Sequence, residues 1–117
     1  TGYVTDQELL ALYRDADVLS HASKYEGFGL QILEAMACGT PVVCSNTGSL
    51  PEVTGEAAIM LDPNDSSGFA REIARVLGDS SVSNRMSQAG IKQAAQFTWE
   101  RAARETISAY ETVHAGV

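Results

Sequence analysis

Basic residues and cysteines are both scarce in this chain, and each shortage excludes a class of protein. Lys and Arg together number 8 against 15 Asp and Glu, so the formal net charge is −7 at pH 7. The basic residues are scattered from Arg14 to Arg104 without a run, whereas nucleic-acid binding needs clustered cations that displace counterions from phosphates. The sequence therefore argues against a nucleic-acid partner.

The two cysteines, Cys38 and Cys44, are too few for a disulfide framework. They are also too few to hold a metal without help from other residues. We interpret both as small buried hydrophobic side chains of a protein in a reducing cytosol.

Long apolar runs are missing as well. The longest stretches fall well short of the about 20 apolar residues that a membrane span requires. Residues 1–6 have neither a basic region nor an apolar core, so we expect no secretory signal there. These features predict a cytoplasmic location without a transmembrane segment, and they leave peripheral membrane attachment of a full-length protein open.

The composition is that of a folded domain. Hydrophobic residues make up 44% and charged residues 20% of 117 residues, which suits one domain with one core. Short apolar runs that fit buried parallel strands lie at 18–22, 42–45 and 58–61. Helix-forming segments lie at about 6–15, 30–38, 50–53, after 66 up to 78, 81–96 and 99–114.

Local signals mark several helix ends. Thr5 followed by Glu8 three residues later is a capping-box pattern, and Gly39 is expected to stop the helix before it. The helix that follows Ser66 is amphipathic, with an apolar face made of Phe69, Ile73, Val76 and Leu77.

Strands that alternate with helices predict an α/β fold with a parallel, three-layer, Rossmann-like sheet. Three strands are few for a doubly wound domain, so we expect residues 1–117 to be one partial domain, with C-terminal helices at about 81–114. In a sheet of order 3-2-1-4-5-6, these strands match positions four, five and six. Strand 18–22 would then have an unpaired edge, which invites association with a missing first half or with a second copy of the chain.

A glycine-rich loop precedes the helix at 30–38. Gly27 and Gly29 let the backbone approach a ligand closely, and the amide groups of the first helical turn supply roughly half a positive charge. Such an end can bind an anion such as a diphosphate. An ordinary tight turn is the alternative reading of the same glycines.

Two glutamates flank this loop and helix. Glu34 stands in a helix that is otherwise nearly all apolar, where a carboxylate is costly unless donors such as ribose hydroxyls contact it. Glu26 follows strand 18–22, at the carboxyl end where parallel sheets place their ligands. The alternatives are a solvated helix edge beside Gln31 for Glu34 and a solvated loop for Glu26.

The residues around these glutamates resemble a known family. Glu26 and Glu34, with seven residues between them, lie in segments 26–30 and 33–43, which closely resemble the signature of family 4 glycosyltransferases. This family of retaining, nucleotide-sugar-dependent enzymes with the GT-B fold is also called glycosyl transferases group 1. The match covers essentially the whole chain, through 16–18, Ser23, 48–53, 62–63 and 97–99.

The resemblance implies the second half of the C-terminal, donor-binding domain of a GT-B fold. In that family the first glutamate faces the transferred sugar and acts in catalysis, the amides of the glycine-rich stretch face sugar and diphosphate, and the second glutamate holds the ribose. Carried over by motif position, the substrate-binding residues are Glu26, Gly27, Phe28, Gly29, Leu30 and Glu34. Ala22 and Gln31 stand where the family often has proline, which bears on loop rigidity rather than on a charged contact.

The resemblance also implies no cofactor and no metal. The donor, such as a UDP- or GDP-hexose, is a substrate, and cationic side chains with the helix dipole stabilise the departing diphosphate. His21 and His114 offer no paired metal ligands, which agrees. The basic residues that meet the diphosphate lie upstream of the matching segment in the family, as does the acceptor domain.

Two functions from different classes follow. The first is the donor-binding part of a retaining transferase that moves a hexose to a sugar, lipid or small-molecule acceptor. This chain alone is expected to be inactive, because the acceptor domain and the cationic contacts lie outside it. The second is a non-catalytic nucleotide-sugar-binding or assembly module that works with a partner chain. Nucleotide-sugar epimerases share the architecture, but the spacing of the glutamates favours the transferases.

Overall fold

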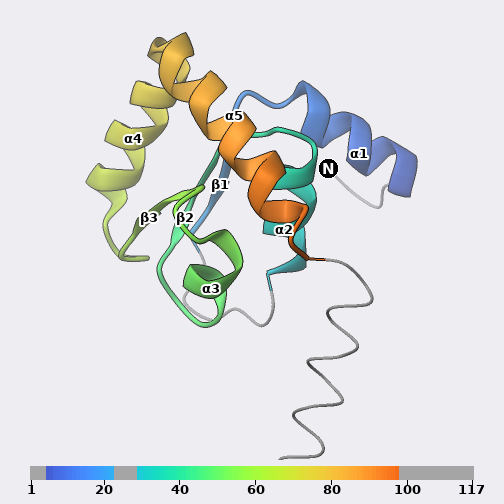
Figure 1. Cartoon of the computed structure of the whole chain (residues 1–117). Coiled ribbons are helices and arrows are strands. Elements are labelled where there is room, and N and C mark those ends of the chain that lie inside the picture. The colour runs from blue at the N-terminus through green and yellow to red at the C-terminus, as the bar shows by residue number, and fades with distance from the viewer. Residues whose placement is uncertain (1–4, 23–28, 98–117) are drawn as a thin grey trace, which may run out of the picture.

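The structure is a computed structural model that describes residues 5–22 and 29–97. The elements, drawn in Figure 1, are α1 (Asp6–Asp15), β1 (Leu19–His21), α2 (Leu30–Ala37), β2 (Val42–Ser45), α3 (Leu50–Thr54), β3 (Ile59–Leu61), α4 (Ser66–Gly78) and α5 (Ser80–Ala94). Each lies within one or two residues of its predicted range, so the α/β expectation is confirmed. The helix expected at 99–114 lies outside the described residues.

The three strands form a parallel sheet in the order β1-β2-β3. Val43 of β2 lies opposite Ser20 of β1 and Ile59 of β3. This order of neighbours is the one expected for positions four to six of a doubly wound sheet. Among the described residues, no further strand pairs with β1, which lies at one end of the sheet.

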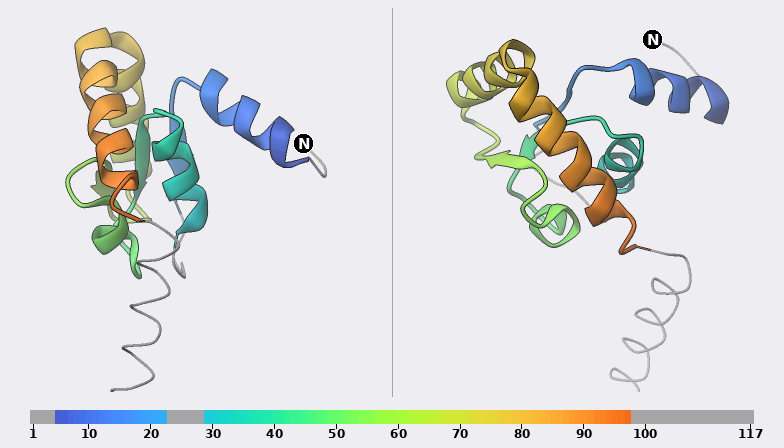
Figure 2. Two further views of the ribbon diagram at one scale, coloured as in Figure 1. Left: turned by 45° about the vertical axis from the view of Figure 1, so that its right-hand side comes forward. Right: turned by 45° about the horizontal axis from the view of Figure 1, so that its top comes forward.

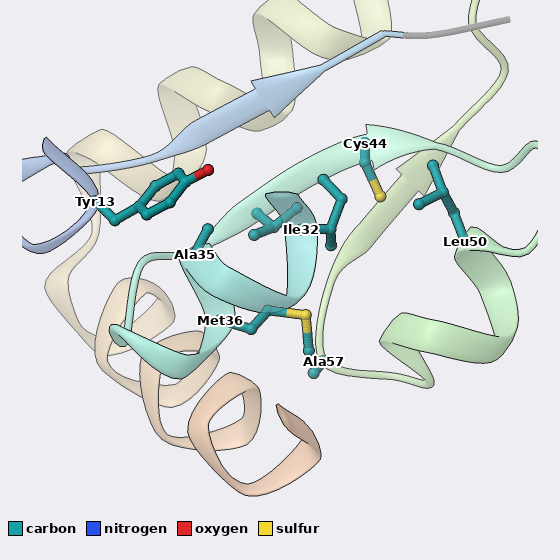
Figure 3. Packing of buried hydrophobic residues seen from close by; sticks show 8 residues of the cluster. Tyr13, Ile32, Ala35, Met36, Cys44, Leu50 and Ala57 are labelled. Carbon is teal, nitrogen blue, oxygen red and sulfur yellow. The ribbon is translucent and has the colours of Figure 1, made fainter. Parts of the chain in front are cut away.

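Helices cover both faces of the sheet because β2 alternates its side chains between two apolar clusters. Val42 and Cys44 belong to a cluster with α1, α2 and α3, which Figure 3 shows from close by. Val43 belongs to a second cluster with Phe69 and Val76 of α4. All four residues of β2 are buried, as expected for a central parallel strand.

Helix α5 connects the two clusters. Val82 near its start packs in the cluster of α4, whereas Ala89 and Ala94 pack against the cluster of α2. Figures 1 and 2 show the helix running from α4 across to α2 and α3, with α1 at the margin of the molecule. Gln93 Nε2 donates a hydrogen bond of 3.0 Å to the carbonyl of Val53, which fixes α5 to α3.

The C-terminal end of α2 is set by a local hydrogen-bond motif. Gly39 has a φ of +79°, and its N–H donates to the carbonyl of Met36 at 3.0 Å. The N–H of Thr40 donates to the carbonyl of Ala35, also at 3.0 Å. These two bonds form a Schellman motif, so the predicted stop at Gly39 is confirmed with its mechanism.

Two expectations about buried side chains have different outcomes. Cys44 is fully buried and Cys38 is half-buried against the α2 cluster, so both act as small hydrophobic residues. Burial raises the pKa of the Cys44 thiol to about 11. Leu77, in contrast, is 56% exposed and takes no part in the predicted apolar face of α4, because Phe69 and Val76 already meet the sheet.

No described helix is both long and apolar enough to cross a bilayer.

Candidate functional site

The candidate site lies where α2 begins, after the carboxyl end of β1. Gly29 is the N-cap of α2, with a φ of +80° in the left-handed region. A Cβ atom on Gly29 would stand 2.6 Å from Cδ2 of the fully buried Leu50, which leaves room for glycine alone. Glu26, Gly27 and Phe28, the other residues predicted for this turn, lie outside the described residues.

The first turn of α2 carries no charge of its own. Gly29 has no side chain to cap the amide groups, and the first turn contains no acidic residue. Leu30 and Gln31 are exposed, and Leu30 exposes 53% of its surface. The positive end of the helix dipole is therefore not neutralised by the helix's own residues, as an anion-binding end requires.

Glu34 lies one turn further along α2, on a strip of the helix that faces outward. Ile32, Leu33, Ala35 and Met36 are buried, whereas Leu30, Gln31 and Ala37 are exposed. Glu34 is half-buried between these two sets. The helix is thus covered on one side rather than on most sides, and Glu34, four residues after Leu30, lies at the margin of the exposed side.

Tyr13 of α1 is the residue at this site that sequence reasoning missed. Only 7% of the residue is exposed, and it packs in one cluster with Ile32, Ala35 and Met36 of α2. Burial, followed by the negative charge of Glu34, raises the pKa of Tyr13 to about 12. The phenol therefore stays protonated at neutral pH. No local signal could have brought the two residues together, because 21 positions of chain separate Tyr13 from Glu34.

Thr40 fixes Tyr13 from the other end of α2. The Thr40 hydroxyl donates a hydrogen bond to the backbone carbonyl of Tyr13, and Thr40 is 3% exposed. Helix α1 is thus held against α2 by this hydrogen bond and by the packing of Tyr13 against Ile32, Ala35 and Met36.

Metal ligands do not gather in this part of the chain. Within residues 5–22 and 29–97, no group of three or more His, Cys, Asp or Glu side chains is arranged to hold a metal ion. The chemistry available at the described site is hydrogen bonding by a carboxylate and by helix amides.

A parallel sheet with helices on both faces, and a glycine-capped helix after its first strand, define an α/β domain of Rossmann-like architecture. The chain belongs to the family Glycosyl transferases group 1, whose model matches residues 1–93.

Relatives of known name agree with this membership. The chain is 49% identical over 110 residues to the O-antigen chain mannosyltransferase B of Escherichia coli, which covers 94% of this chain. It is 38% identical over 118 residues to the MMP alpha-(1->4)-mannosyltransferase of Mycolicibacterium hassiacum, which covers 97% of it. The chain spans 29% of the length of each of these relatives.

Solved structures show the same fold. The sucrose-phosphate synthase of Thermosynechococcus elongatus superposes with a TM-score of 0.82 at 32% identity, over 100% of this chain and 30% of that one. The C-terminal domain of a glycosyl transferase group 1 family protein from Francisella tularensis has a TM-score of 0.73 at 29% identity. That match covers 82% of this chain and 51% of the other. The fold is therefore similar to that of GT-B glycosyltransferases.

Proposed function

We propose that this chain is the part of a retaining, family 4 hexosyltransferase that binds the nucleotide-diphosphosugar donor. The observation that carries the proposal is the arrangement on α2, where an N-terminus capped by glycine and the half-buried Glu34 lie on one helix. A diphosphate at the first turn and a ribose one turn along would match these two features. The glycosyltransferase family of the chain supports the same reading.

In this proposal the residues divide the donor between them. Glu34 accepts hydrogen bonds from the ribose, and the amides of Gly27, Phe28, Gly29 and Leu30 contact the sugar and the diphosphate. Glu26 contacts the transferred hexose as the catalytic carboxylate. The relatives named as mannosyltransferases make mannose the first hexose to test.

The proposed reaction uses no metal and no cofactor. The helix dipole of α2, together with cationic side chains outside this chain, stabilises the charge that develops on the departing diphosphate. The acceptor, whether a sugar, a lipid or a small molecule, is bound by a separate domain. We propose a cytoplasmic enzyme that either stays free or attaches to the membrane surface.

The missing first half of the sheet is the proposed partner of this chain. It would pair with the outer edge of β1, which no described strand covers. Alone, the chain would associate through this edge with a second copy, and it would transfer no sugar.

The test compares two glutamate variants in the full-length protein. Glu34→Gln is expected to weaken binding of the nucleotide diphosphate and of the nucleotide sugar alike, by about 1.5 to 3 kcal/mol, because a charged acceptor is lost. Glu26→Gln is expected to leave nucleotide diphosphate binding near wild type and to lower turnover. Calorimetry with UDP, GDP and ADP, and their sugars, measures the first effect, and product formation measures the second.

Glu56→Gln is the matched control, since Glu56 is an exposed glutamate of the turn before β3 and does not belong to α2. It should change neither binding nor turnover. Equal losses for nucleotide and nucleotide sugar in Glu26→Gln would refute the division of roles. Donor binding by the full-length protein without turnover on any acceptor would instead indicate the non-catalytic binding module.

A further inference from the structure

We propose that a cavity between α4, α5 and the amino end of β3 binds a small zwitterion with an apolar body, such as a free amino acid with an aliphatic side chain. The inference goes beyond the proposed function, because none of the residues that line this cavity belongs to the donor site on α2.

The cavity lies at the end of the sheet opposite the donor site. Glu56 and Ala57 precede β3 and Ile59 is its first residue, so they line the cavity at the amino end of that strand. The strands are parallel, so their carboxyl ends share the other edge of the sheet, where α2 follows β1. In Figure 1, α4 and α5 meet at the top of the molecule, whereas α2 begins near the bottom. A ligand in the cavity therefore leaves the donor site open.

The cavity has the size of a small-molecule site and a mostly apolar lining. Its volume is about 320 Å³, at the lower end of the range of about 300 to 1,000 Å³ for ligand pockets. Five of its eight lining residues are apolar, namely Ala57, Ile59, Val82, Met86 and Ala89. A standard protein interface has about 20 to 30 residues on each side, far more than line this cavity. The cavity therefore suits a small molecule with an aliphatic group rather than a protein partner.

Charges of both signs border the apolar part of the cavity. Arg75 of α4 and Arg85 of α5 line it together with Glu56 from the turn before β3. Three different elements of the fold thus bring two guanidinium groups and one carboxylate to the same cavity. All three residues are exposed, so a ligand in solution can reach their charged groups.

Arg85 and Glu56 take no part in the ion pairs of the described fold. Within residues 5–22 and 29–97, the ion pairs join Arg71 and Arg75 to Glu72. Nε of Arg75 lies 2.7 Å from a carboxylate oxygen of Glu72, so that guanidinium is already partly engaged. Arg85 is therefore the main cation that the cavity offers to a ligand, and Glu56 is the anion.

A zwitterion satisfies both of these charges at once. A guanidinium has a fork of donors that matches the two oxygens of a carboxylate, and a carboxylate accepts hydrogen bonds from an ammonium group. An amino acid carries a carboxylate and an ammonium group on one carbon, with its side chain beyond them. In the proposed complex the ligand carboxylate contacts Arg85, the ammonium group contacts Glu56, and the aliphatic side chain fills the apolar part. An anion alone leaves Glu56 without a partner, and a cation alone leaves Arg85 without one.

Ligand truncation in the full-length protein tests the inference. The ligands are leucine and three analogues that each lack one feature: isocaproate lacks the ammonium group, isoamylamine lacks the carboxylate, and glycine lacks the aliphatic side chain. Ligand-observed NMR titrations give the dissociation constants. Leucine is expected to bind with a dissociation constant of about 1 mM or below. Each analogue should bind at least about 10-fold more weakly, because one charged hydrogen bond or the apolar contact is lost.

Arg85→Gln locates the site. It should weaken leucine binding about 5- to 20-fold and leave isoamylamine binding unchanged, because isoamylamine has no carboxylate to lose. Arg71→Gln is the matched control, since Arg71 is an exposed arginine of α4 that does not line the cavity. It should leave leucine binding unchanged. Ala89→Leu is the second variant if Arg85→Gln does not fold; its larger side chain should fill the apolar part and weaken leucine at least about 10-fold without changing a charge.

Several results would overturn the proposal. These are no binding of leucine, equal binding of leucine by wild type and Arg85→Gln, or an equal loss in Arg71→Gln. Isocaproate or isoamylamine binding as tightly as leucine would show a simple anion or cation site instead.

A competition titration separates this site from the donor site. Leucine is titrated with and without a saturating amount of whichever of UDP, GDP and ADP raises the melting temperature most. Its dissociation constant should stay unchanged, and displacement of leucine by the nucleotide would contradict a separate site. If no nucleotide binds, the proposed donor function fails, while the leucine titrations of wild type and Arg85→Gln still decide this inference.

Discussion

The N-termini of α2 and α4 are built in opposite ways. Helix α4 begins at Asp65, whose Oδ1 accepts a hydrogen bond of 2.9 Å from the N–H of Gly68. Helix α2 begins at Gly29, in a left-handed conformation and without a side chain to cap it. Helix α4 is therefore closed by its own carboxylate, whereas the N-cap residue of α2 provides no side chain to do the same.

The remaining helices extend the comparison. Helices α1 and α5 are capped by the side chains of Thr5 and Asp79, as α4 is by Asp65. Helix α3 has no side-chain cap bond either, but it is one short turn with Pro51 near its start, and proline has no N–H to satisfy. Among the described helices longer than five residues, α1, α4 and α5 are each capped by a side chain, whereas α2 is not.

The largest effect is expected where the glycine cap of α2 is replaced. Gly29→Ala should destabilise the protein by about 2 to 4 kcal/mol, because alanine is strained at a φ of +80° and its Cβ would stand 2.6 Å from Leu50. Chemical denaturation measures the change in the free energy of unfolding. Gly90→Ala is the control, since its Cβ would meet Met36 at an ordinary 3.5 Å. Equal losses in the two variants would show that the conformation of Gly29 is not special.

An intermediate effect is expected at the aspartate cap of α4. An alanine Cβ at Gly68 would collide with the Asp65 carboxylate, so Gly68→Ala should displace the cap and cost about 1 to 2 kcal/mol. Gly78→Ala, at the other end of the same helix, meets no atom within 4 Å. It should stabilise the protein by about 0.5 kcal/mol, because alanine loses less backbone entropy than glycine. Thermal and chemical unfolding should both show a loss of stability in Gly68→Ala and a gain in Gly78→Ala. A stabilising Gly68→Ala would contradict the role of Asp65 as a cap.

The smallest effect on stability is expected at low pH, at the aspartate cap of α5. Hydrogen bonds from the Ser81 hydroxyl, at 2.6 Å, and from its N–H, at 3.0 Å, hold the pKa of Asp79 below its usual range. A lowered carboxyl pKa stabilises the folded state fully above the unfolded value of about 3.9, and this contribution is lost as the pH falls through the lower folded value. The glycine cap of α2 has no such group.

Asp79→Asn should keep a cap on α5 at neutral pH and unfold with a weaker pH dependence below about pH 4 than wild type. Melting temperatures of both proteins, taken from neutral pH down to acid, measure the difference. Parallel curves over the whole range would mean that Asp79 contributes no acid sensitivity.

Most element boundaries could be predicted because their signals are local. Thr5 and Glu8 form the capping box that their spacing predicts, with bonds of 3.2 and 3.0 Å between side chains and backbone. Strand β2 was predicted from a short apolar run and has the predicted bounds. The residues of the site that lie within α2, Gly29, Leu30 and Glu34, were identified from the motif, whereas the roles assigned to them stay predictions.

Leu77 shows where prediction ended. It belongs to the predicted apolar face of α4, yet it is exposed. Helical periodicity gives the angle between side chains on one helix, but not how wide the contact with the neighbouring element is. Helix α4 meets the sheet over a face too narrow to include Leu77.

The sequence by itself determined where the helices begin and end, the parallel order of the strands and the glycine at the start of α2. The helix ends depend on hydrogen bonds that span three to five residues, and the expected strands depend on apolar periodicity. Both signals come from residues that are close together in the sequence. Only the tertiary structure decided that Tyr13 packs against Ile32, Ala35 and Met36, since this contact depends on how α1 packs against α2. Packing brings distant positions together through shape and volume, and no local pattern of residues specifies which pair will touch.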